Sequence, residues 1–244
     1  FYNTGKRINN GLIRLGHSVL EFSDRDIISN HRKLNDLNGG KYLNKKLLMV
    51  IGNYVPDLII LGHADLIDIK TLKTIKIFYP KIKIAQWFLD RMDSKWKFNR
   101  KRFFDKIDIM NGSFCTTDPN SLKFTKKKLI HYMPNPVDES FEVLDNYKYK
   151  NFKNDVFFAM SHGVHRGVLK KGKFDERENF LKGLTDKLPN IKFDLYGVKN
   201  KQPVWADNFI KAISQSKIAL NLSQGKASKY YTSDRFAQLI GNGL

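Results

Sequence analysis

The sequence predicts an α/β protein of two domains, each built around a mostly parallel β-sheet. Short apolar runs typical of strands alternate with amphipathic stretches typical of helices along most of the 244 residues. Several of the apolar runs are continuous, as expected for parallel strands that are covered on both faces. A connector with Pro134 and Pro136 interrupts this alternation, which resumes after residue 154. We therefore place a domain boundary near residue 140.

The first domain, residues 1–140, is predicted to begin with a helix at residues 4–15. Ile8, Leu12 and Leu15 fall on one face of that helix, and Gly16 is a suitable residue to end it. The other elements predicted for this domain are strands at 17–22, 56–62, 81–88, 106–112 and 127–133, helices at 43–54 and 66–80, and a short helix that opens at Pro119.

The second domain, residues 141–244, is predicted to repeat a strand followed by a helix three times. Its predicted strands are at 155–163, 191–197 and 217–223, and its predicted helices are at 175–189, 206–215 and 233–241.

The composition limits the classes of partner. The formal net charge of +19 is spread through both halves of the chain and comes mainly from Lys. Such a charge is typical of an ordinary solvated surface, and it also suits anionic ligands or anionic lipid head groups. Phosphate-reading arginine clusters, zinc fingers and RNA-binding aromatic signatures are absent from the sequence, so we expect no nucleic acid partner.

The single Cys115 excludes an intramolecular disulfide framework and a metal site with several cysteines. No apolar run approaches the roughly 20 residues that a membrane-spanning helix needs. The sequence opens without Met and stops on GNGL, so we expect that both ends are truncated. We expect a cytoplasmic protein, and peripheral contact with the inner face of an anionic membrane is compatible with the charge.

The predicted strand, polar loop and helix of residues 216–244 have the order of an anion site. Ser233 or Thr232 can cap the helix, whose first N–H groups have no partner within the helix. Arg235 is unfavourable in the first turn of a helix on dipole grounds, but it becomes suitable if a diphosphate lies there. The same residues also fit an ordinary capped helix with an exposed arginine.

Two other stretches of the second domain follow strand ends, where open α/β sheets bind ligands. The loop after the strand at 155–163 carries His162, Gly163 and Arg166 among several lysines, which suits phosphate oxygens but also fits a solvated loop. Tyr196 and Gly197 end the next strand, where main-chain groups can hold a nucleobase and where the tyrosine can equally belong to the core.

In the first domain, His63 and Asp90 each lie just past a predicted strand end. A carboxylate beside aromatic residues at such a place suits a sugar or an acid/base role, although Trp87 and Phe88 also fit a core. Known nucleophile, phosphate-loop and zinc-binding motifs are absent from the sequence, so we expect no bound metal.

The two α/β domains, the PNPVD connector and the segments LYG, KIALNLS and YYTSDRFAQLIGNGL together resemble the GT-B glycosyltransferases. Within that fold they resemble the spore-maturation-type group (glycosyl transferases family 1-like). The resemblance implies two Rossmann-like domains that face a cleft, with the acceptor on the first domain and a nucleotide-sugar donor on the second. It also implies that no cofactor is needed besides the donor substrate.

The resemblance implies roles for individual residues. Tyr196 and Gly197 would flank the base, Asn221 and Ser223 would line the cleft, and Arg235 would face the diphosphate. Gln238 stands where many GT-B enzymes carry a ribose-binding Glu, so the chain departs from the pattern there. The full set implied for the donor is His162, Gly163, Arg166, Arg177, Tyr196, Gly197, Asn221, Ser223, Tyr231, Ser233, Asp234, Arg235 and Gln238.

The function predicted is metal-independent transfer of a sugar from a nucleotide-diphosphate sugar to a glycan, lipid-linked or protein acceptor. Arg235 would stabilise the departing diphosphate, and Asp90 or His63 would be the base for the acceptor. Two alternatives stay open at this point: a nucleotide-sugar epimerase of the same fold, and a non-catalytic nucleotide-sugar-binding module.

Overall fold

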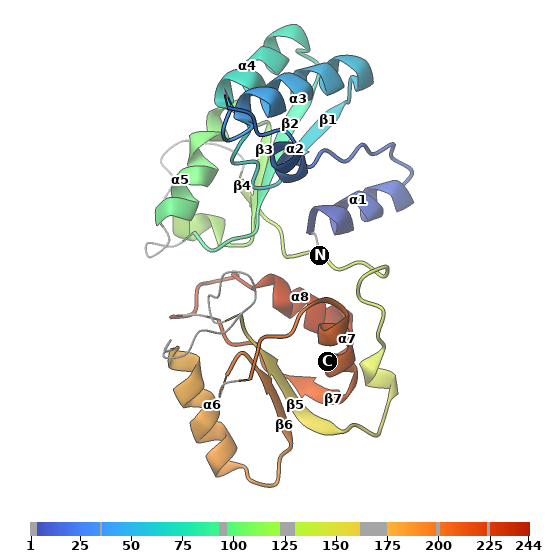
Figure 1. The fold of residues 1–244 in the computed structure, drawn as a ribbon, viewed down its shortest axis with the longest axis vertical. Helices are drawn as coiled ribbons and strands as arrows, with labels where there is room; N and C mark the ends of the chain where they lie inside the picture. Colours follow the sequence, from blue (N-terminus) through green and yellow to red (C-terminus); the bar gives the residue numbers. More distant parts are fainter. Residues whose placement is uncertain are drawn as a thin grey trace. The chain divides into compact units, whose positions relative to one another are not determined.

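The computed structural model describes residues 4–34, 36–92, 97–122, 130–161, 175–198, 201–223 and 225–244. By their contacts the residues form two compact units, shown in Figure 1. The N-terminal unit comprises Leu12–Pro134 and Ser228–Tyr231. The C-terminal unit comprises Phe1–Gly11, Asn135–Ala227 and Thr232–Leu244. The helix α1 (Thr4–Arg14) therefore contributes residues to both units.

The N-terminal unit is built on a four-stranded parallel sheet in the order β1-β2-β3-β4. Its strands are β1 (Leu58–Leu61), β2 (Lys83–Phe88), β3 (Gly112–Cys115) and β4 (Ile130–Tyr132). Its helices are α2 (Asp24–Asn30), α3 (Gly40–Tyr54), α4 (Ile69–Phe78), α5 (Lys97–Asp105) and the 3-10 turns η2 (Ile107–Ile109) and η3 (Pro119–Leu122).

Apolar side chains from the helices and the sheet form the core of this unit. Leu43 and Leu47 of α3 and Leu72 and Ile75 of α4 pack in one cluster with Ile84 of β2. A second cluster joins Phe88, at the end of β2, to side chains of α5, η2, β3 and η3. The apolar residues at helical spacing in α3 and α4 therefore face the core, as the sequence predicted.

The C-terminal unit holds a second parallel sheet, with three strands in the order β6-β5-β7. These strands are β5 (Asn154–Ala159), β6 (Phe193–Tyr196) and β7 (Ser216–Ala219). The helices of this unit are α6 (Glu176–Lys187), α7 (Ala206–Ser214), α8 (Asp234–Gly241) and the 3-10 turn η4 (Asn146–Lys148).

Alternation along β5 divides this unit into three layers. Phe157 and Ala159 pack with residues of α7 and α8 on one face of the sheet. Phe158 and Met160 pack with Leu181 of α6 on the other face (Figure 1). The central strand is thus covered on both faces, which explains its continuous apolar sequence.

The α/β class and the parallel sheets are confirmed, but two predicted strands are wrong. Residues 17–22 form no strand, and most of their side chains are exposed or half-buried while Phe22 packs against the core. Residues 107–109 form η2, and β3 begins only at Gly112. The alternating Ile107 and Ile109 face the core from a 3-10 turn as well as they would from a strand.

Within the described ranges, no helix has both the length and the apolar character needed to traverse a bilayer. The division of the chain at residue 140 and the predicted cleft stay predictions.

Candidate functional site

The strand order of the C-terminal unit reverses at β5. The chain leaves β5 through α6 to β6 on one side and then returns through α7 to β7 on the other side. In open α/β sheets, ligands bind outside the carboxyl ends of the strands at such a reversal. The place to look for a ligand site is therefore the point where β5 and β7 end.

Arg235, in the first turn of α8, reaches this point. Its Nη1 donates to the carbonyl oxygen of Ala159 at the end of β5, at 2.6 Å. Its Nη2 donates to the carbonyl oxygen of Leu222, beyond β7, at 2.9 Å, and to Oδ1 of Asn221 at 2.9 Å. The guanidinium also lies 5.5 Å from the centre of the Phe158 ring. These contacts hold a positive charge between the two strand ends.

Arg177 brings a second guanidinium to the same carbonyl. Its Nη1 lies 3.4 Å from the carbonyl oxygen of Leu222, to which Arg235 also donates. Asp175 holds Arg177 with two hydrogen bonds, of 2.8 and 2.7 Å, and also caps α6 by accepting the backbone N–H of Arg177. Two guanidinium groups and one carboxylate thus meet beside Leu222, which leaves a net positive charge there.

Ser233 precedes α8, but its role differs from the predicted one. Its hydroxyl donates to Oδ1 of Asn221 at 3.2 Å and makes no capping bond to α8. Predicted capping by this side chain is therefore wrong, because Asn221 competes for the hydroxyl. The structure brings Ser233, Asn221 and Arg235 together, as expected for one site. Ser223, the residue after Leu222, is half-buried.

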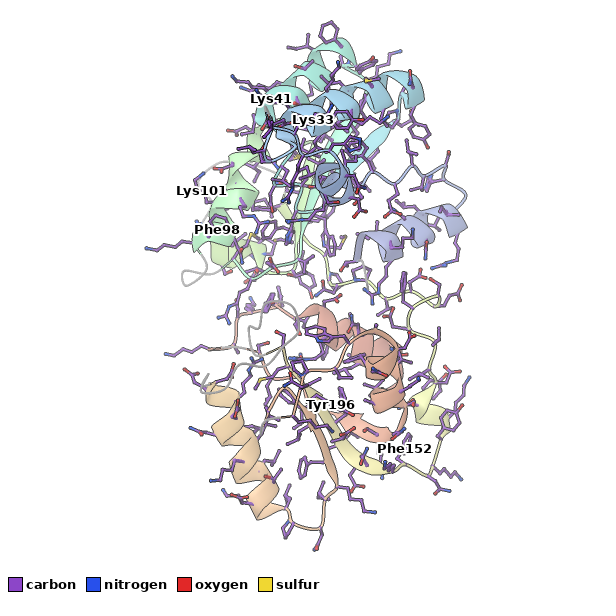
Figure 2. The ribbon with its side chains drawn as sticks, in the orientation of Figure 1. Lys33, Lys41, Phe98, Lys101, Phe152 and Tyr196 are labelled. Carbon is purple, nitrogen blue, oxygen red and sulfur yellow. The ribbon has the colours of Figure 1, made fainter. Side chains whose placement is uncertain are left out.

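Tyr196 and Gly197 end β6, beside the end of β5. Gly197 has a φ of +74°, and a Cβ there would overlap the carbonyl oxygen of Met160. The ring of Tyr196, labelled in Figure 2, has the Nζ of Lys201 3.7 Å from its centre. Asp194 pairs with the same Nζ at 2.7 Å. Only glycine fits at position 197, because both its backbone conformation and the close carbonyl exclude a side chain.

Asp234 and Gln238 lie in a different environment from Arg235. The amide of Gln238 donates to Asp234 at 2.9 Å, and Oδ1 of Asp234 lies 3.5 Å from Nη1 of Arg7. Burial raises the pKa of Asp234, while nearby Arg7 lowers it and Glu142 raises it. Asp234, one of the residues expected to contact the donor, is therefore the half-buried member of an ionic cluster with Arg7 and Glu142.

Arg7 is the centre of that cluster, and the sequence analysis missed it. Its side chain is fully buried and donates twice to Glu142, with Nη2 to Oε1 at 2.6 Å and Nε to Oε2 at 3.1 Å. Oε2 of Glu142 also accepts the backbone N–H of Asp138 at 2.8 Å. The Phe141 ring centre lies 5.2 Å from the guanidinium. In sequence Arg7 is an ordinary polar residue of an amphipathic helix, so nothing local marked it.

Four more residues were predicted to contact the donor. His162, Gly163 and Arg166 lie outside the described residues. Tyr231 belongs by its contacts to the N-terminal unit, together with the rest of residues 228–231.

In the N-terminal unit, His63 and Asp90 come together at the ends of β1 and β2. Nε2 of His63 lies 3.6 Å from Oδ2 of Asp90, and the imidazole stacks on Phe88 with ring centres 4.6 Å apart. Burial lowers the pKa of His63, and the nearby carboxylate of Asp90 opposes this shift. Nδ1 of His63 lies 3.4 Å from a guanidinium nitrogen of Arg102, which can only donate. The neutral imidazole therefore carries its proton on Nε2, the nitrogen that faces Asp90.

Two cations that the sequence analysis did not single out, Arg102 and Lys106, hold the loop of His63 in place. Arg102 of α5 forms two hydrogen bonds to Asp65, one of them at 2.8 Å, and Lys106 donates to the carbonyl oxygen of Ala64. Burial lowers the pKa of Lys106, and Asp65 opposes this effect. Ala64 has a φ of +43°, an unusual value for a residue with a side chain. A strained loop held by two cations is typical of a functional position.

Part of the chain is similar to a known protein family. A family model described as "Glycosyl transferase-like" matches residues 176–244, from the start of α6 to the end of the sequence. No curated protein matches the chain. The matched stretch contains Arg177, Asn221 and Arg235, so the part of the chain that is similar to this family includes these three residues of the candidate site. This supports glycosyl transfer in general as the activity.

Proposed function

We propose that the protein is a glycosyltransferase of the spore-maturation-type GT-B group that uses a nucleotide-diphosphate sugar as donor. One observation carries this proposal. Two guanidinium groups, of Arg235 and Arg177, converge on the carbonyl oxygen of Leu222 where the strand order reverses, within a glycosyltransferase-like domain. A diphosphate is the ligand that such a concentration of positive charge suits best.

Catalysis in the C-terminal unit would rest on stabilising the leaving group. When the sugar is transferred, the bond between its anomeric carbon and the diphosphate breaks, and negative charge grows on the departing phosphate oxygen. Carbonyl oxygens and Asp175 hold both guanidiniums before the ligand arrives, so their field needs little rearrangement to stabilise that charge. Arg235 is therefore our proposed catalytic residue on the donor side.

The other donor residues would position the nucleotide. Tyr196 and Gly197 would hold the base through the main chain, and Asn221 and Ser223 would line the sugar side of the site. Gln238 would accept a ribose hydroxyl with its amide oxygen, because its amide nitrogen donates to Asp234.

Asp90 is our proposed base for the acceptor hydroxyl. Because the proton of neutral His63 is on Nε2, the imidazole can donate towards Asp90 but cannot accept a proton with that nitrogen. His63 would then orient Asp90, while the carboxylate, with 39% of its side chain exposed, accepts the acceptor's proton. The acceptor would be a glycan, lipid-linked or protein hydroxyl group.

The reaction would need no metal ion, because the two guanidiniums can neutralise the diphosphate. It would also need no cofactor besides the donor, and no nucleic acid partner.

Binding and turnover measurements on the full chain test the proposal. We expect nucleoside diphosphates to raise the melting temperature of the protein more than the matching nucleosides do. A nucleotide sugar supplied with a glycan mixture should release the nucleoside diphosphate and label the glycan. Binding without any turnover would identify a binding module instead, and a changed sugar on an intact donor would identify an epimerase.

The variant Arg235→Ala tests the site itself. Losing a hydrogen bond to a charged group costs roughly 1.5–3 kcal/mol, so diphosphate binding should weaken about 10- to 150-fold. Binding of the bare nucleoside should change much less. Lys182→Ala, an exposed change on α6, is the matched control and should leave both affinities unchanged. Equal losses for both ligands would show that Arg235 acts only through the fold.

A further inference from the structure

The segment between α2 and α3 exposes two leucines. Leu34 is 96% exposed and Leu37 is 74% exposed. Together with Arg32 and Lys33 they line one open hollow of about 830 Å³. Figure 2 shows Lys33 and Lys41 close to each other at the N-terminal end of α3. We call Arg32, Lys33, Leu34, Leu37 and Lys41 the basic leucine loop.

Backbone hydrogen bonds fix the shape of this loop. Lys33 and Asp36 form an antiparallel bridge, in which the N–H of each donates to the carbonyl oxygen of the other, at 3.3 and 2.9 Å. Nearby, the ring of His31 stacks on Tyr42 of α3 with centres 4.0 Å apart. The leucines are therefore presented by a segment that is tied to the first turn of α3.

The charge of the loop is positive because its three cations, Arg32, Lys33 and Lys41, outnumber the single carboxylate of Asp36. The carboxylate of Asp36 accepts the backbone N–H groups of Tyr42, at 2.9 Å, and Lys41, at 3.2 Å. These two hydrogen bonds, of which the one from Tyr42 has the larger effect, hold the pKa of Asp36 below its ordinary value. Arg32, Lys33 and Lys41 are exposed around the leucines.

We propose that the basic leucine loop docks the protein on the surface of an anionic lipid bilayer. Leucine side chains that enter the boundary of the acyl chains are removed from water, while neighbouring cations meet the anionic head groups. This combination fits a bilayer better than a nucleic acid, whose phosphates would leave the two leucines in water. The net charge of +19 adds a long-range attraction to the same kind of surface. The inference does not depend on the proposed enzymatic activity.

A second exposed apolar pair gives an internal control. Ile77 and Phe78 are 74% and 73% exposed at the C-terminal end of α4. The neighbouring Tyr79 lies beside Gly52, near the C-terminal end of α3. The basic leucine loop is at the opposite end of α3, a helix of 15 residues and thus about 22 Å long.

The experiment is co-sedimentation of the full chain with vesicles. Vesicles of phosphatidylcholine alone are compared with vesicles that contain phosphatidylglycerol, at low and high salt. The test variants are L34S/L37S, which keeps the charge, and R32E/K33E, which keeps the leucines. Their controls are I77S/F78S and K182E/K187E, which change equivalent numbers of exposed residues elsewhere. Circular dichroism checks that each variant is folded.

We expect binding to anionic vesicles only, a loss of binding at high salt, and at least a tenfold lower partition coefficient for both test variants. The apolar control, I77S/F78S, should bind anionic vesicles within about twofold of the unaltered protein. The charge control, K182E/K187E, should lose less binding than R32E/K33E, because it weakens only the long-range attraction to the vesicle. The proposal is overturned if the unaltered protein does not bind anionic vesicles. It is also overturned if I77S/F78S loses binding while L34S/L37S keeps it. It is equally overturned if L34S/L37S binds as well as the unaltered protein.

Discussion

The buried pair of Arg7 and Glu142 allows a quantitative prediction about the stability of the C-terminal unit. In Arg7→Met the side chain keeps much of its length but loses its charge. The carboxylate of Glu142 then stays buried, with the backbone N–H of Asp138 as a remaining partner and with Asp234 nearby. Removing one partner of a buried ion pair costs about 3–5 kcal/mol, because the other charge is left uncompensated. We expect a loss of that size in the free energy of unfolding.

The double variant Arg7→Met/Glu142→Gln separates the charge from the packing. Glutamine keeps an acceptor for the N–H of Asp138 but carries no charge, so the double variant should be more stable than Arg7→Met alone. We expect a coupling free energy of at least about 1.5 kcal/mol between the two positions. Lys182→Met on α6 is the control, and a change of an exposed lysine should cost under about 0.5 kcal/mol.

Unfolding in guanidinium chloride, followed by tryptophan fluorescence, measures these free energies. Replacing Trp87 and Trp96 with Phe leaves Trp205, at the start of α7, as the only tryptophan, so the signal reports on the C-terminal unit. Burial raises the pKa of Asp234 and Arg7 opposes that shift, so without Arg7 this carboxyl should take up a proton more readily. The destabilisation by Arg7→Met should therefore shrink as the pH falls. A loss below about 1 kcal/mol at pH 7, or a double variant no more stable than the single one, would refute this account.

Five other predictions concern single sites and the metal. Gly197→Ala should destabilise the C-terminal unit in a denaturant titration. Gly183→Ala should stabilise it by about 0.5–1 kcal/mol, because Gly183 is in a helix with open space around it. An equal effect of the two substitutions would contradict the strain assigned to position 197. Asp90→Asn should lower kcat by about 10²–10⁴-fold and His63→Gln by less, and the reverse order would make His63 the base. Since burial lowers the pKa of His63 below 6.5, its contribution to stability should be complete above that pH and be lost as the pH falls, which a pH series of melting temperatures can check. Activity should survive EDTA, and a loss that Mg²⁺ restores would reject the metal-independent mechanism. Cys115 is buried and its pKa is raised to about 11, so a thiol reagent at pH 8 should label it only after unfolding, and rapid labelling of the native protein would contradict its burial.

The elements of the C-terminal unit were predictable because local patterns determine them. The apolar run of β5 is buried by helices on both faces, so it stands out from the polar sequence around it. The strand predicted at 17–22 failed because alternation of apolar and polar residues also fits an irregular segment with one core residue, Phe22. Local pattern contains no information on whether a neighbouring strand is present to pair with.

The candidate site was predictable where chain direction alone brings residues together. His63 and Asp90 were each selected as residues just past a strand end. Because β1 and β2 are adjacent and parallel, those ends lie at the same edge of the sheet, and the two side chains come within 3.6 Å. Arg102 and Arg7 were not predictable, because their roles depend on contacts between distant segments.

The membership of α1 in both units has a consequence for the order in which the protein can assemble during synthesis. Arg7 and Glu142 are 135 residues apart in the sequence, and nearly all of the N-terminal unit is encoded between them. At about 5–20 residues per second, Arg7 is made roughly 7–27 s before its partner. Most of the N-terminal unit is made in that interval, while the start of α1 must wait for the last hundred residues. A nascent chain paused before residue 142 would therefore carry an arginine whose partner, the carboxylate of Glu142, has not yet been made.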